Sequence, residues 1–145
     1  MSELKLIRSE IDVLSRALKW YAGDKKVCLV TVIGTWGSSP RPIGAMMAIS
    51  EAGDLIGSVS GGGIEEGLVC NVVNNFPKSN LFLNYSSENH NSLPCGGHVS
   101  LFVEPVFSST KFETFLNKLK SFESVIRLIN KETGDSILIS KKETN

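Results

Sequence analysis

The 145-residue sequence has little cysteine, no excess of charge of either sign and no long apolar run. Its three cysteines, Cys28, Cys70 and Cys95, are too few and too scattered for a disulfide framework, so we expect reduced thiols. The 15 Lys and Arg balance the 15 Asp and Glu, which leaves no basic excess for nucleic acid. No stretch reaches the roughly 20 apolar residues that a bilayer requires, and no signal-peptide block begins the chain. These absences predict a cytoplasmic protein without nucleic-acid or membrane partners.

What the sequence contains is a succession of helix-like and strand-like patterns. Apolar residues recur every three or four positions near 2–23, 64–76 and 112–122, which predicts helices. Short apolar or alternating runs predict strands at 27–33, 45–49, 55–59, 81–85, 99–105, 125–129 and 137–139. We therefore predict an α/β fold with α+β character. It is expected to be a single domain over residues 1–145, with a small mixed sheet, hairpins and about three packing helices.

A glycine-rich segment joins a predicted strand to a predicted helix. Its candidate site residues are Ser60, Gly61, Gly62, Gly63 and, in the first turn of the helix, Glu65. Backbone N–H groups at a helix N-terminus, beside glycines that let a ligand approach the main chain, can bind an anion. A tight strand-to-helix turn is the simpler alternative. The segment has neither the Lys-Ser or Lys-Thr of a P-loop nor the spacing of a dinucleotide fingerprint.

A second segment is stiffened by prolines. Pro40 and Pro42 push the residues before them into extended conformations, which holds Arg41 out on a rigid loop. The guanidinium is a planar fork suited to phosphate or carboxylate oxygens, and Ser38 and Ser39 add hydroxyls. Arg41 in solvent on a purely structural loop is the alternative.

A third segment, Leu93-Pro-Cys-Gly-Gly-His98, presents a thiol beside two glycines. Glycine pairs do not build cores, so Cys95 with Gly96 and Gly97 is predicted to be accessible to a ligand, whereas Cys28 and Cys70 are expected to be packed. Zinc is disfavoured, because paired Cys-x-x-Cys spacing and a fourth ligand are missing.

Together, three motifs resemble the XdhC/CoxI family in order and spacing. They are Gly37-Ser-Ser-Pro-Arg-Pro-Ile-Gly-Ala45, Gly57-Ser-Val-Ser-Gly-Gly-Gly-Ile-Glu65 and Leu93-Pro-Cys-Gly-Gly97 with Phe102-Val-Glu-Pro105. The resemblance implies an accessory factor, not a catalyst, that binds the molybdenum cofactor (molybdopterin) as cargo. It also implies delivery to a xanthine dehydrogenase-type apoenzyme, a cysteine desulfurase as a further partner, and a homodimer. Cys95 is then the predicted metal-facing thiol.

Two features depart from the family pattern. Gly63 stands where the family's glycine loop commonly has a cysteine, so one metal-facing thiol is missing. The family's C-terminal Rossmann-like domain has no counterpart before Asn145. Two other functions stay open. One is a small cysteine-dependent enzyme acting on a phosphorylated or thiol substrate, with Cys95 as nucleophile and His90 or His98 as base. The other is an interaction domain with a decayed site.

Overall fold

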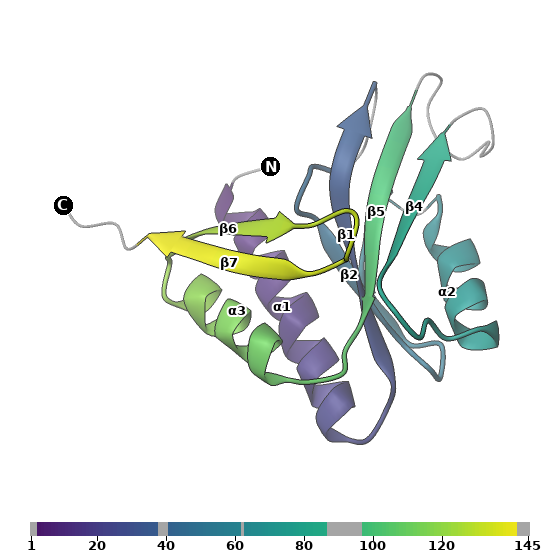
Figure 1. The fold of residues 1–145 in the computed structure, drawn as a ribbon, viewed down its shortest axis with the longest axis horizontal. Helices are drawn as coiled ribbons and strands as arrows, with labels where there is room; N and C mark the ends of the chain where they lie inside the picture. The colour runs from purple at the N-terminus through teal and green to yellow at the C-terminus, as the bar shows by residue number, and fades with distance from the viewer. Residues whose placement is uncertain (1–2, 38–40, 62, 87–96, 142–145) are drawn as a thin grey trace.

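The computed structural model describes residues 3–37, 41–61, 63–86 and 97–141, with the side chains of 3–8, 140 and 141 excepted. Its elements are, in chain order, α1 (Glu3–Ala22), β1 (Val27–Trp36), β2 (Met46–Ser50), β3 (Leu55–Gly57), α2 (Glu65–Asn74), β4 (Leu81–Ser86), β5 (His98–Pro105), α3 (Thr110–Lys120), β6 (Ser124–Ile129) and β7 (Ser136–Lys141). The α/β class, the hairpins and the helices are thereby confirmed (Figure 1).

The main sheet has five strands in the order β3-β2-β1-β5-β4, and β6 and β7 form a separate hairpin. In one detail the sheet differs from the prediction: its neighbouring strands are all antiparallel instead of mixed. The reason lies in the connections. The helical crossover, α2, carries the chain from one edge strand, β3, to the other edge strand, β4, so it does not place two parallel strands side by side.

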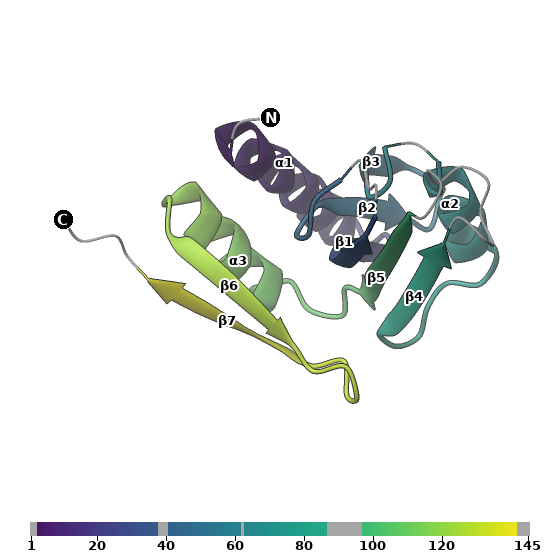
Figure 2. The ribbon, with the colours of Figure 1, turned by 90° about the horizontal axis from the view of Figure 1, so that it is seen from above.

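Helices cover both faces of the sheet (Figure 2). One face packs against α2, and its core includes Cys28, Val30 and Val32 of β1. The other face packs against α1 and α3, and its core includes Val27 and Leu29 of the same strand. Successive side chains of a strand point to opposite faces. As far as Val32, the odd-numbered residues of β1 therefore face α1 and α3, and a register shift follows between Val32 and Gly34.

One side of α1 is buried against the sheet. Val13, Leu14 and Ala17 are its most buried residues, and Glu10 is 7% exposed among them. Glu10 lies four positions before Leu14 and seven before Ala17, which is the spacing of one helix face. A carboxyl group is thus held inside the apolar layer between α1 and the sheet.

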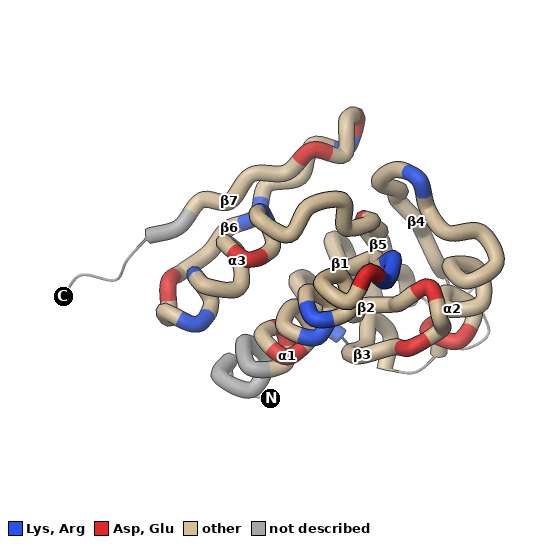
Figure 3. Tube along the Cα trace, turned by 90° about the horizontal axis from the view of Figure 1, so that it is seen from below, with Lys and Arg blue, Asp and Glu red and all other residues tan. Residues whose placement is uncertain are grey.

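The outer face of the β6–β7 hairpin is aliphatic and exposed. Ile126 pairs with Ile139 across the hairpin, and Leu128 pairs with Ile137. Charged residues of both signs are spread over the other elements instead of gathering on one of them (Figure 3). None of the described helices is both long and apolar enough to cross a membrane.

Candidate functional site

The glycine loop is organised by the carboxylate of Glu65, the first residue of α2. The hydroxyl of Ser58 donates to Oε2 at 2.5 Å, and the hydroxyl of Ser60 donates to Oε1. The backbone N–H groups of Val59 and Ser60 also donate to Oε2, each at 3.3 Å. The N–H of Ile64 donates to Oε1 at 3.2 Å and to the Ser60 hydroxyl at 2.9 Å. Glu65 thereby ties the end of β3 to the start of α2.

These contacts control the ionisation of Glu65. Burial alone would raise the pKa of Glu65, but the hydrogen bonds from Ser58, Ser60 and the backbone outweigh it and lower the pKa below its usual value. The carboxylate is therefore ionised at neutral pH, 6% exposed, at the N-terminus of α2. Negative charge at this end of a helix is stabilised by the helix dipole.

The predicted anion-binding loop is thus partly filled by the chain's own anion. The N–H groups of Val59, Ser60 and Ile64 donate to Glu65, and that of Gly61 donates to the Ser58 hydroxyl at 2.9 Å. A bound anion would have to share these donors or use other groups nearby. Gly62 lies outside the described residues.

Gly57 sets how the chain enters the loop. Its φ of +87° lies in the left-handed region, and a Cβ there would stand 2.4 Å from the carbonyl oxygen of Met46 and 2.7 Å from Val13. No side chain fits at this distance, so the sharp exit from β3 depends on glycine. The loop is held from β2 and α1 as well as from α2.

Arg41 lies beside this loop and connects it to α1. Its Nε donates to the carbonyl oxygen of Ser58 at 3.2 Å, and its Nη2 lies 3.8 Å from Oε1 of Glu10. Only 12% of the Arg41 side chain is exposed. The proline-flanked loop thus brings Arg41 to the glycine loop. This proximity is needed if the two predicted segments are to form one site. Ser38 and Ser39 lie outside the described residues.

A cavity of about 670 Å³ opens where these parts meet. Its walls include Arg41, Gly61 and Glu65 of the predicted set. They also include Cys70 and Glu66, which the sequence did not suggest as site residues. Cys70 was expected to be packed in the core, and this prediction is wrong, because the thiol is exposed on the outer side of α2. Its position five residues after Glu65 was the available signal, since it places both on a helix that begins at the loop.

The other two thiols differ. Cys28 is buried in the sheet as predicted, and burial raises its pKa to about 12. Cys95 and Gly96 lie outside the described residues, and Gly97 is buried directly before β5. His98 packs edge-on against Trp36 and lies 3.5 Å from the Asn84 side-chain oxygen. Within the described ranges, no three His, Cys, Asp or Glu side chains gather as a metal-binding group.

Fold and site together define a class of protein: an α/β domain that presents a cavity at a glycine loop braced by a buried carboxylate, an arginine and a helix N-terminus. Residues 20–72 match the XdhC and CoxI family, and they include β1, the Arg41 loop and the glycine loop. Residues 20–72 therefore resemble the XdhC and CoxI family, as their motifs indicated. This family consists of accessory factors for xanthine dehydrogenase maturation.

A comparison of structures supports the fold. A crystal structure from Bacillus halodurans, described as a xanthine dehydrogenase, is similar with a TM-score of 0.61 and 19% sequence identity. The match covers 91% of this chain and 45% of that one. A search of curated protein sequences gives no significant match. The chain thus shares its fold with about half of the Bacillus protein.

Proposed function

We propose that this protein binds the molybdenum cofactor as cargo and delivers it to a xanthine dehydrogenase-type apoenzyme. The observation that carries the proposal is the cavity at the glycine loop, because Arg41, Gly61 and Glu65 from two separate predicted motifs line it together. Both motifs lie inside the residues that match the family.

The charges around the cavity orient the cargo. The cofactor combines a pterin, a phosphate and a dithiolene that holds the metal. Glu65 and Glu66 line one part of the cavity and repel a phosphate, whereas Arg41 attracts it. We therefore place the phosphate on the Arg41 side. The glycine backbone lets the flat pterin approach the main chain.

The metal end requires a soft ligand, since thiolates favour such metals. Cys95 is the thiol that we predict for this role, with Gly96 and Gly97 as its predicted neighbours in the site. Cys70 is an exposed thiol on the wall of the cavity at the glycine loop. The cavity surface therefore still carries a thiol, although Gly63 stands where the family usually has a cysteine.

A carrier suits the family match better than the cysteine-dependent enzyme, because the matching family consists of accessory factors. His98 contacts the Trp36 ring and lies 3.5 Å from the Asn84 side-chain oxygen, while Cys95 and His90 lie outside the described residues. The apoenzyme, a cysteine desulfurase and a second copy of the chain are the partners that we expect.

Gel filtration tests the proposal directly. Purified protein is mixed with molybdenum cofactor released from a donor enzyme, and molybdenum and pterin fluorescence are followed in the protein peak. Co-elution of both is expected. Absence of both from the protein peak would contradict the proposal.

Three variants and one control locate the site in the same assay. Arg41→Gln should retain less cofactor, because a charge-assisted hydrogen bond contributes about 1.5 to 3 kcal/mol. Arg16→Gln, at an exposed position of α1, is the matched control and should bind like wild type. Cys95→Ser should lose molybdenum while Cys70→Ser loses less. Equal retention by Arg41→Gln and Arg16→Gln would remove Arg41 from the site.

A further inference from the structure

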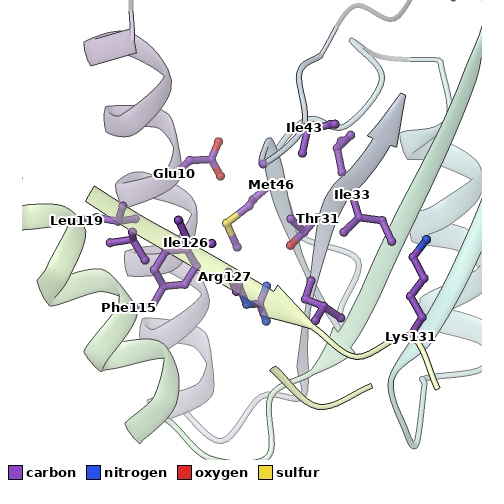
Figure 4. Close-up of a pocket in the computed structure, with 14 residues that line it drawn as sticks. Glu10, Thr31, Ile33, Ile43, Met46, Phe115, Leu119, Ile126, Arg127 and Lys131 are labelled. Carbon is purple, nitrogen blue, oxygen red and sulfur yellow. The ribbon is translucent and has the colours of Figure 1, made fainter. Parts of the chain in front are cut away.

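A second cavity of about 520 Å³ lies on the opposite face of the sheet, between β1, α1, α3 and the β6–β7 hairpin (Figure 4). Most of its wall is apolar, with Met46, Phe115 and Leu119 among the contributors. Its size falls within the range of sites that bind small molecules. The Glu65 loop and its cavity do not contribute to this wall.

Three largely buried polar side chains interrupt the apolar wall, and each comes from a different element. They are Glu10 of α1, Thr31 of β1 and Arg127 of β6. Glu10 and Thr31 are each 7% exposed, and the Arg127 side chain is 10% exposed. Figure 4 shows all three around the space in front of Met46.

Several polar atoms of these side chains have no hydrogen-bond partner among the described residues, although Oε1 of Glu10 lies 3.8 Å from Nη2 of Arg41. They are both carboxyl oxygens of Glu10, Oγ1 of Thr31 and Nη1 of Arg127. Buried polar atoms are almost always paired in folded proteins. Their concentration around one cavity points to a ligand that supplies the missing partners. Thr31 faces the apolar side of β1, where an aliphatic side chain would pack as well without leaving a hydroxyl unpaired.

Arg127 is held firmly for this role. Its Nη2 makes a short hydrogen bond with Oε1 of buried Glu104. The guanidinium also lies 5.5 Å from the ring centre of Phe102 and 5.8 Å from that of Phe115. The ion pair uses one nitrogen and leaves Nη1 as a fixed donor at the cavity wall.

The polar groups favour a ligand that accepts hydrogen bonds. Burial raises the pKa of Glu10 to about 8, against the smaller opposing effects of Arg41 and the Met46 backbone. Its carboxyl is then mostly protonated at neutral pH and can donate, as the Thr31 hydroxyl and Arg127 can. Lys131, at the exposed rim, adds a positive charge.

We propose that this cavity binds a small organic acid, with a carboxylate that accepts from Arg127 and Thr31 and a flat aromatic or compact aliphatic body that packs against Phe115, Leu119 and Met46. The site is separate from the one proposed for the molybdenum cofactor, and its test does not depend on that function.

A series of three probes with the same ring tests the proposal. Calorimetric titration of the full chain uses 1-naphthoate, neutral 1-naphthalenemethanol and cationic 1-naphthylmethylammonium at pH 7. We expect naphthoate to bind at least ten-fold more tightly than the alcohol, and the ammonium to bind most weakly. No heat from naphthoate at millimolar concentration, or equal affinity for all three probes, would overturn the proposal.

Matched variants locate the probe. Thr31→Val keeps the shape of the side chain but removes the hydroxyl, and it should weaken naphthoate binding at least three-fold without lowering thermal stability. Ser136→Ala is the control, because Ser136 also has a buried hydroxyl without a partner among the described residues, yet lies outside this cavity. It should bind naphthoate like wild type. Leu119→Trp should block the cavity. Unchanged naphthoate affinity in Thr31→Val would refute the assigned contact.

Discussion

Glu10 makes the stability of this protein depend on pH in a direction unusual for a glutamate. Burial raises its pKa from the usual 4.5 to about 8 in the folded state. The folded protein then keeps a proton that the unfolded chain has lost. Stability consequently falls as the pH rises from about 4.5, and the loss is complete above about pH 8, where both states are ionised. Glu10→Gln, which cannot ionise, should lack this loss.

The size of the effect follows from the shift. The rise from 4.5 to about 8 corresponds, at about 1.4 kcal/mol per pH unit, to roughly 5 kcal/mol between the two limits. This figure is an upper limit, because structural relaxation and water entry reduce the penalty of a buried charge. Relative to wild type, Glu10→Gln should therefore gain several kcal/mol of stability on going from pH 5 to pH 8.

Urea unfolding at pH 5, 6, 7 and 8 measures this difference, because subtracting the two curves removes every titration that both proteins share. Glu66→Gln, at an exposed position of α2, controls for the loss of a carboxyl group elsewhere. A Glu10→Gln minus wild-type difference that stays constant within about 0.5 kcal/mol, the ordinary scatter between independent sites, would refute the account of Glu10.

Three further predictions concern the glycine loop and the thiols. Glu65→Gln should lower the free energy of unfolding by about 1.5 to 3 kcal/mol at pH 7. Because the folded pKa of Glu65 is lowered, this deficit should shrink as the pH falls below 4.5, as urea unfolding of both proteins at pH 3 and pH 7 would show. Gly57→Ala should cost about 2 to 5 kcal/mol from its left-handed backbone and its clash with Met46, which a lowered thermal midpoint would reveal; an unchanged midpoint would contradict the geometry. In native labelling with iodoacetamide followed by mass spectrometry, exposed Cys70 should react while Cys28 does not; modification of Cys28 at the rate of Cys70 would disprove this.

The elements were predictable because local patterns determine them. The spacing of apolar residues located α1, α2 and α3, and short β-branched runs located the strands to within a few residues. The strand order was not predictable in the same way. It depends on α2 connecting one edge strand to the other, and the apolar pattern of α2 does not specify beside which strand the following strand pairs.

The candidate site was predictable where glycine and proline constrain the backbone, as at Gly57 and around Arg41. The partners of the polar groups were not. Glu65 satisfies the loop's own N–H groups, and Ser58 contributes as much as Ser60. These contacts depend on the side-chain conformation of one glutamate, which a sequence motif does not specify. The exposed face of Cys70 likewise depends on how α2 packs on the sheet.

Arg41 shows why a single residue can resist interpretation from sequence. The sequence alone allows either a ligand-binding arginine or a solvated loop residue, but in the structure Arg41 contacts both the Ser58 carbonyl and Glu10. Through Glu10 it borders the apolar cavity, and through Ser58 it borders the glycine loop. Its positive charge opposes the effect of burial on the pKa of Glu10. Removing Arg41 therefore changes the cofactor surface and the ionisation of Glu10 at once. Cofactor binding should therefore be compared between Glu10→Gln and the Arg41→Gln, Glu10→Gln double variant. If the double variant binds less cofactor than Glu10→Gln alone, the loss can be assigned to a direct contact of Arg41 with the cargo.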